Sequence, residues 1–300
     1  MKFLTFKLDG KPQLGLVLDE STVYNLTRSW NDLFTGEAPR DLADLISSNI
    51  DVCELKERVS KAHDADHVLS TTDVEFMPPI AFPKKNVFCV GRNYREHIIE
   101  GNRAAGRDPH NFPMAPEFFS KPPTTVVGHG ASVRAHADVT ELLDYEVELG
   151  IVIGRRGTNI RREEALEYVF GYTVINDITA RDLQKSHGQW FKGKALDTTC
   201  PIGPVVVNRS ALPNAQELQL ELYVNGELRQ HANTIDMLFT VPEIIEQLSA
   251  GLTLEPGDII ATGTPSGVGF AMTPPRRLVA GDMVLARISG IGDLMNRIVD

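Results

Sequence analysis

The pattern of apolar and polar positions predicts a β-hairpin at the start of the chain. Apolar residues alternate with polar ones over positions 4–8, and an apolar run over 14–18 follows the turn sequence Asp9-Gly10. Between about Asp41 and Asp66 the composition becomes charged and favours helix. We therefore expect a small N-terminal sheet followed by helical segments.

Prolines mark a boundary before the next strand. Pro79 and Pro83 lie in the segment PPIAFPKK, and the apolar run NVFCVG follows it directly. We place a domain boundary near residues 78–86. It divides the chain into a small N-terminal α+β domain, residues 1–80, and a larger domain, residues 81–300.

The larger part is rich in short strands. Its apolar or alternating runs are ELGIVIG, VFGYTVIND, GPVVVN, LQLELYVNGELRQ and DIIATG. Within them, Asn225-Gly226 predicts a hairpin with a type I′ turn. One clear helix begins at Thr240, where Glu243 forms a capping box, and ends near Gly251. The fold class is thus a mixed, β-rich α+β fold.

The amino-acid composition indicates which binding partners and which cellular compartment to expect. The 300 residues are 42% hydrophobic and 23% charged, as in ordinary globular proteins, and the net charge of −10 gives no attraction to nucleic acid. Three cysteines without a C-x-x-C pair do not indicate a disulfide framework or a zinc ribbon. The sequence has no long apolar stretch, so it supports neither a signal peptide nor a membrane span. We expect a cytoplasmic protein without membrane or nucleic-acid partners.

Two glutamates and an aspartate form a candidate metal site. Glu146 and Glu148 are two apart in LDYEVELGIVIG, so both side chains project from one face of a strand. A solvated strand face is the alternative for this pair alone. Asp177, at the end of the next apolar run, adds a third carboxylate. Three oxygen ligands favour a hard divalent ion such as Mg²⁺, Mn²⁺ or Ca²⁺ over zinc.

A histidine and a glutamate form a candidate proton-transfer pair. His97 and Glu100 are three apart, which places them on one face of a helical turn if the segment is helical. A carboxylate beside an imidazole raises its basicity, as removal of a proton from water requires, although such a pair is also common on exposed helices. Gly91 and Gly101 suggest flexible joints on either side, as a lid would need.

Further polar residues surround these groups in the sequence. Arg181 and Gln184, which follow Asp177, are candidates to face the same ion and bind an anionic substrate. Lys194 lies in KGKALDTTCP, where a solvated lysine is the alternative. The segment ATGTPSGVG lacks both nucleotide-binding glycine patterns. We interpret it as a backbone nest for a carboxylate, with Thr264 adding a hydroxyl.

Together these segments resemble the fumarylacetoacetate hydrolase family. The resemblance spans about residues 86–300 and is carried in order by VGRNYREHIIE, FFSKPPTTVVGHG, LDYEVELGIVIG, VFGYTVINDITARDLQ, KALDTTCPIGP, GDIIATGTPSGVG and AGDMVLARISGIGDLMNRI. It implies a mixed β-sandwich roll and a homodimer. It also implies Mg²⁺ or Mn²⁺ bound by Glu146, Glu148 and Asp177.

The same resemblance assigns further roles. It makes His97 and Glu100 a water-activating pair on a mobile lid over residues 93–105, and Lys194 the cation beside the metal. The residues that it places at the substrate are Arg92, Tyr94, Arg181, Gln184 and Thr264.

Carbon–carbon bond cleavage in small β-keto or diketo acids is the function that this resemblance implies. Oxaloacetate decarboxylation comes slightly ahead of acylpyruvate hydrolysis. Both reactions form an enolate, which a divalent ion and Lys194 would stabilise. One alternative is a 2-hydroxyhepta-2,4-diene-1,7-dioate isomerase or 5-oxopent-3-ene-1,2,5-tricarboxylate decarboxylase. Another is a binding or scaffold protein that retains the fold without catalysis.

Overall fold

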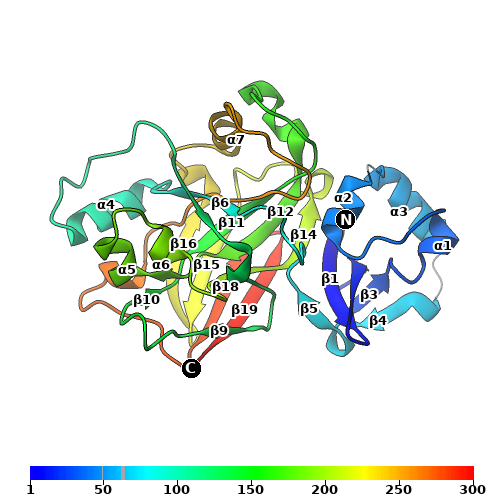
Figure 1. Ribbon diagram of the computed structural model, residues 1–300, viewed down its shortest axis with the longest axis horizontal. Coiled ribbons are helices and arrows are strands. Elements are labelled where there is room, and N and C mark those ends of the chain that lie inside the picture. The colour runs from blue at the N-terminus through cyan, green and yellow to red at the C-terminus, as the bar shows by residue number, and fades with distance from the viewer. Residues whose placement is uncertain (49, 62–64) are drawn as a thin grey trace.

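The protein is β-rich, with few and mostly short helices (Figure 1). The computed structural model describes residues 1–48, 50–61 and 65–300. In this part of the chain the largest sheet has twelve strands. Ten of them follow the order β4 (Val68–Ser70), β3 (Thr22–Asn25), β2 (Lys11–Val17), β1 (Lys2–Leu8), β14 (Cys200–Asn208), β12 (Val169–Asn176), β11 (Val147–Ile153), β17 (Ile259–Ala261), β6 (Val87–Gly91) and β7 (Glu117–Lys121).

The remaining strands complete this sheet and form two others. β5 (Glu75–Met77) pairs with β1, and β8 (Val126–Val127) pairs with β14. A second sheet has the order β16 (Glu227–Asn233), β15 (Gln219–Val224), β18 (Met283–Ile288), β19 (Gly292–Val299) and β9 (Ser132–Arg134). A third pairs β10 (Leu143–Asp144) with β13 (Thr179–Ala180).

Helices connect and cover the strands. The α-helices are α1 (Trp30–Leu33), α2 (Leu42–Ser47), α3 (Val52–Lys61), α4 (Arg95–Ala104), α5 (Arg181–Ser186), α6 (Phe191–Lys194) and α7 (Val241–Ser249). Short 3-10 turns are η1 (Ala65–His67), η2 (Thr71–Asp73), η3 (Pro123–Thr125), η4 (Arg162–Tyr168), η5 (Arg209–Ala211), η6 (Thr234–Asp236) and η7 (Gly269–Ala271). Among the described residues, no helix has the length and apolar character needed to cross a bilayer.

The predicted N-terminal hairpin is present, and its sheet continues into the rest of the molecule. β1 pairs antiparallel with β2 across the turn Asp9-Gly10 and, near its start, with β14. The N-terminal elements α1 to α3, β1, β3 and β4 gather on the right of Figure 1, and α4 to α6 lie on the left. The division into residues 1–80 and 81–300 stays a prediction.

Other local predictions agree with the structure. α2 and α3 form in the charged segment 41–66, of which positions 49 and 62–64 lie outside the described residues. Asn225 and Gly226 have φ values of 52° and 80°, as a type I′ turn requires, between β15 and β16. α7 follows Thr240, whose backbone N–H and hydroxyl both donate to the Glu243 carboxylate at 2.8 Å.

The large sheet is covered on both faces, which explains the unbroken apolar character of β11. Leu149 and Ile151 belong to a core shared with β15, β18 and β19. Val152, which points to the opposite face, packs in a second core that includes residues of α2 and α3. All seven residues of β11 are buried. Polar side chains on this strand therefore lie away from bulk water and need partners within the protein.

A buried asparagine ties together the segments that approach the site. The Asn93 side chain, just after β6, donates to the carbonyl oxygens of Phe239 at 3.0 Å and Thr262 at 2.7 Å. Its amide oxygen accepts from the Phe239 N–H at 2.7 Å. The residue is fully buried. One side chain thus fixes the end of β6 against the end of β17 and the approach to α7.

We expect Asn93→Ala to lower the free energy of unfolding by about 3 kcal/mol, because it leaves buried backbone groups without hydrogen-bond partners. Denaturant titration of both proteins measures this. The control is Asn214→Ala at an exposed position, which should change stability by less than about 0.5 kcal/mol. Equal stabilities of the two variants would contradict the assignment.

Candidate active site

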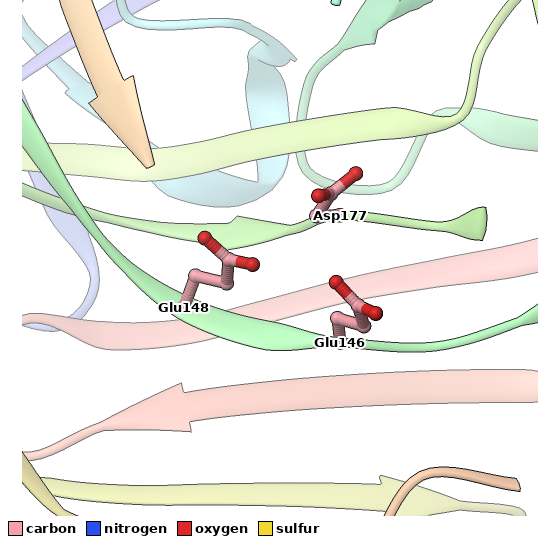
Figure 2. A group of neighbouring side chains, drawn as sticks. All are labelled: Glu146, Glu148 and Asp177. Atoms are coloured by element: carbon pink, nitrogen blue, oxygen red, sulfur yellow. The ribbon is translucent and has the colours of Figure 1, made fainter. Parts of the chain in front are cut away.

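Three carboxylates converge where β11 begins and β12 ends. Glu146 precedes β11, Glu148 lies within it, and Asp177 directly follows β12. The strands are antiparallel with Val147 opposite Asn176, so these ends are adjacent. Figure 2 shows Glu146 and Glu148 on the same side of one strand and Asp177 on its neighbour. One carboxylate oxygen of each lies within 4.8 Å of the others, and all three residues are buried.

Two lysines partly balance these acids. The Lys194 ammonium donates to Glu146 Oε2 at 2.8 Å and to Asp177 Oδ2 at 2.6 Å. Lys121 forms an ion pair with Asp177 Oδ1 at 2.9 Å and donates to the carbonyl oxygen of Ile178 at 3.0 Å. Both lysines are at most 2% exposed, so water does not screen these pairs.

An arginine links the same acids to a further carboxylate. Arg181 donates through Nε to Asp144 Oδ2 at 2.9 Å, and its Nη2 lies 2.6 Å from Glu146 Oε1. Nη1 donates to Gln184 Oε1 at 3.2 Å. α5, which carries Arg181 and Gln184, packs against α6, which carries Lys194. Arg181 therefore fixes the position of Glu146 from the side opposite Lys194.

The surroundings separate the pKa values of the two glutamates. Burial raises the pKa of Glu146, but Lys194 and Arg181 outweigh it and lower the pKa to about 2. Burial, Asp177 and Glu146 together raise the pKa of Glu148 well above its ordinary value. Although burial opposes it, Asp177 and Glu146 raise the pKa of Lys194. Glu146 and Lys194 are therefore charged, and the negative charge of Glu148 is the least well compensated.

The donor set fits a hard divalent cation. Four buried carboxylates, of Asp144, Glu146, Glu148 and Asp177, face three buried cations, of Lys121, Lys194 and Arg181. A buried cluster with excess negative charge requires a further cation or a proton. Glu146, Glu148 and Asp177 offer only oxygen atoms, which Mg²⁺ and Mn²⁺ prefer.

The predicted proton-transfer pair is formed on α4. His97 Nδ1 lies 2.9 Å from Glu100 Oε1. The backbone N–H of Gly267 donates to both Glu100 oxygens, at 3.1 and 2.9 Å. Glu100 is thus held in place from the loop after β17, and it in turn orients the imidazole. His97 and Glu146 line the same cavity, so the pair faces the acidic cluster.

The interpretation of two glycines as flexible joints was wrong. Gly91 is the last residue of β6 and Gly101 lies inside α4, so neither directly flanks the helix. A Cβ atom at Gly91 would clash with the Trp190 ring. The absence of a side chain at Gly91 therefore serves a close approach of the indole. Sequence alone does not separate these two uses of glycine.

The glycine-rich loop after β17 does bind carboxylates, but they belong to the chain itself. The backbone N–H of Gly263 donates to Glu148 Oε2 at 2.7 Å, and that of Gly269 to Asp144 Oδ1 at 2.8 Å. With the bonds from Gly267 to Glu100, one loop therefore holds three acids of the site. The Thr264 hydroxyl donates to the carbonyl oxygen of Val147 at 3.0 Å.

A cavity of about 830 Å³ opens onto these groups. The predicted site residues that line it are Arg92, His97, Glu146, Glu148, Arg181, Gln184, Lys194 and Thr264. Arg92 has a φ of 53°, which is uncommon outside glycine and frequent at functional sites. The structure does not bring Tyr94 to the cavity lining: its side chain is 2% exposed at the start of α4.

Two residues of the cluster were missed from sequence. Asp144 precedes Glu146 by two positions, the same spacing that separates Glu146 from Glu148. The alternation of side chains along a strand could therefore have placed Asp144 on the same face. Lys121 ends an apolar strand and carries no pattern of its own. Its role follows only from the fold, which brings the Lys121 ammonium at the end of β7 within 2.9 Å of Asp177.

Comparisons with known proteins agree on one family. Residues 86–299 match the family model described as fumarylacetoacetate (FAA) hydrolase C-terminal. The oxaloacetate tautomerase YisK of Bacillus subtilis (strain 168) is 46% identical over 99% of this chain and 100% of its own length.

Solved structures show the same similarity. A fumarylacetoacetate hydrolase from the psychrophile Exiguobacterium antarcticum superposes with a TM-score of 0.82 at 41% identity, over 100% of this chain and 99% of that one. The maleylpyruvate hydrolase from Sphingobium sp. SYK-6 gives a TM-score of 0.77 at 28% identity, over the same fractions.

Asp144→Asn should lower the free energy of unfolding by about 3–5 kcal/mol, because it removes a buried charge that pairs with Arg181. Chemical denaturation measures the change. Asp138→Asn, at an exposed position, is the matched control and should have almost no effect. A loss below about 1 kcal/mol at Asp144 would show that the pair is dispensable for stability.

Proposed function

Since the chain belongs to the fumarylacetoacetate hydrolase family, a family of enzymes, we propose that it catalyses enol–keto tautomerisation of oxaloacetate or a close 2-keto diacid. One observation carries the proposal. A histidine–glutamate pair and a buried cluster of oxygen ligands line or adjoin a single cavity. The name and 46% identity of the full-length relative support the choice of oxaloacetate.

Mg²⁺ or Mn²⁺ is the proposed cofactor, held by Glu146, Glu148 and Asp177. Such an ion supplies positive charge and open coordination positions for a 2-keto acid, whose negative charge grows as the enolate forms. Lys194 and Arg181 already bind the carboxylates of this cluster. Their proposed role is to position Glu146 and Asp177.

His97 is the proposed acid–base group. With Nδ1 bound by Glu100, the neutral ring carries its proton on Nδ1 and offers Nε2 as the acceptor. From the keto form, Nε2 accepts a proton from C3, and the C3–H electron pair becomes the C2–C3 double bond as C2–O becomes single. The imidazolium then returns this proton to that oxygen, which gives the enol and the neutral ring, and the steps reverse to give the ketone. Glu100 stabilises the imidazolium in between.

The substrate contacts proposed from sequence fall into two groups. Arg92, Gln184 and Thr264 line the cavity and can reach a bound diacid. Arg181 lines it too, but its guanidinium is paired with Asp144 and Glu146. Arg92 also pairs with Glu117 at 2.9 Å, which fixes its guanidinium at the wall. Tyr94, which does not line the cavity, is better placed to support α4.

Tautomerisation was absent from the reactions predicted by sequence. Decarboxylation of oxaloacetate and hydrolysis of acylpyruvates form the same enolate, and they remain the second proposal. The observation in favour of hydrolysis is the pair His97–Glu100, which could activate water as well as move a carbon-bound proton. The solved maleylpyruvate hydrolase is similar in fold throughout its length.

An isomerase and a non-catalytic scaffold have less support. A 2-hydroxyhepta-2,4-diene-1,7-dioate isomerase from Mycobacterium marinum is similar in structure, but at 29% identity and a TM-score of 0.73. A non-catalytic scaffold does not require a buried, negatively charged cluster beside a histidine–glutamate pair. A homodimer in the cytoplasm stays a prediction.

The deciding experiment follows enol-oxaloacetate by its ultraviolet absorbance, above the uncatalysed rate, beside assays of decarboxylation and acetylpyruvate hydrolysis. We expect tautomerisation to dominate, to require Mn²⁺ or Mg²⁺, and to stop with a chelator. Turnover that is unaffected by chelator would refute the metal. Dominant release of CO₂ or acetate would favour the second proposal.

Glu148→Gln should weaken Mn²⁺ binding by about 100-fold or more, because it removes one charged oxygen ligand and keeps the shape of the side chain. Isothermal titration calorimetry of the metal alone measures this without a substrate. Glu167→Gln is the control: it makes the same substitution at an exposed position and should leave Mn²⁺ affinity unchanged. Unchanged affinity in Glu148→Gln would place the ion elsewhere.

His97→Ala should lower tautomerisation by roughly 10²- to 10⁴-fold, as loss of an acid–base group does, with the larger effect on kcat. Mn²⁺ affinity should stay within a few-fold of the wild type. The control is His231→Ala on β16, where the side chain is exposed. A fall in metal affinity that matched the fall in rate would show that His97 acts on the metal site instead.

A further inference from the structure

A second cavity, of about 720 Å³, lies away from the active site and is lined mostly by basic side chains. Lys84, Lys85, Arg155 and Arg156 contribute to its wall, against one acid, Glu255. The chain as a whole has a net charge of −10, so this concentration of positive charge runs against its general character.

The acids nearby leave part of this positive charge uncompensated. Lys85 donates to Asp258 Oδ2 at 2.7 Å, and Arg156 donates to Glu255 Oε1 at 3.0 Å. Lys84 and Arg155 form no ion pair within 4.0 Å with any residue that the structure describes, although Asp44 and Glu164 lie close enough for a weaker charge interaction with them. The Arg155 guanidinium instead lies 5.1 Å from the centre of the Tyr168 ring. That contact orients Arg155 without neutralising it.

The two cavities lie at opposite ends of the same three strands. Lys85 lies before the start of β6 and Arg92 follows its end. Glu255 likewise lies before β17, and Gly263 lies after it. β11, which pairs antiparallel with β17, runs from Glu148 back toward Arg155. At roughly 3.3 Å per strand residue, the two sites are about 20 Å apart. A small substrate cannot span both, so the second cavity is not a subsite of the first.

We propose that this second cavity binds a small anion with two or more phosphoryl or carboxylate groups. Like charges gathered in a concave surface repel one another, and a multivalent anion removes that repulsion. Guanidinium groups match the paired oxygens of phosphate and carboxylate. The volume is that of a site for a metabolite, larger than a single inorganic ion needs. This inference does not depend on the reaction proposed above.

Calorimetric titration of the metal-free, full-length protein with pyrophosphate and, separately, citrate at low ionic strength tests the proposal. We expect saturable binding of at least one probe that weakens with added salt. Binding of pyrophosphate alone identifies a phosphoryl ligand, and binding of citrate alone identifies a carboxylate ligand. No saturable binding of either probe would overturn the proposal.

The double variant K84E/R155E locates the binding. We expect it to weaken affinity by about 10-fold or more, since two attractions become repulsions. K11E/R134E makes the same change in net charge at exposed positions elsewhere and should bind normally. Equal weakening in both double variants, or none in K84E/R155E, would refute this location.

Two further measurements keep the test independent of folding and of catalysis. K84Q/R155Q removes the charges without reversing them, and it should give a smaller loss of affinity in the same direction. Both positions are exposed, so the unfolding temperature without ligand should stay close to that of the wild type. Mn²⁺ affinity at the acidic cluster should not change. A loss of Mn²⁺ affinity in K84Q/R155Q would mean that the substitutions disturb the sheet, and would overturn the assignment.

Discussion

The burial of negative charge at the start of β11 is the constraint on which the site depends. Four carboxylates lie where water cannot solvate them, and three buried cations are too few to neutralise them. Lys194 and Arg181 hold Glu146 from two sides, which keeps its pKa low. The remaining imbalance falls on Glu148. An arrangement of this kind costs stability unless a divalent cation completes it, and this is the physical reason for assigning a metal to these acids.

This constraint also explains the form of the surrounding fold. β11 lies in the middle of the large sheet, with one core formed with the second sheet and another formed with α2 and α3. The apolar positions of the strand exclude water from the acids at its start. The first helices of the chain thus pack on the sheet that carries the site, although they lie far from the acids in sequence.

Local patterns predicted much of the fold, because they depend on neighbouring residues. The alternation of apolar and polar residues at the N-terminus predicted β1 and β2. Asn225-Gly226 predicted the turn between β15 and β16, because both residues tolerate the positive φ values that a type I′ turn requires. The Glu146–Glu148 spacing placed both acids on one face. The pairing of β1 with β14 joins residues about 200 apart, and no local pattern reports such a contact.

The same distinction separates the site residues that were found from those that were missed. His97 and Glu100 interact within one helical turn, so their spacing was informative. Lys121 reaches Asp177 at 2.9 Å although three strands separate β7 from β12 in the sheet order, and no local pattern reports such a contact. Gly91 was assigned flexibility because the approach of Trp190 depends on a segment about 100 residues further along the chain.

The loop that follows β17 has a consequence for how the sequence can vary. Its backbone N–H groups at Gly263, Gly267 and Gly269 each contact a different acid, so the loop length sets three positions at once. A Cβ atom at Gly267 would clash with the Arg229 carbonyl oxygen, which leaves little room for any side chain there. Inserting or deleting one residue between 263 and 269 would shift the donors out of register with their acceptors. The site therefore requires both the length of this segment and its glycine at 267 to stay constant.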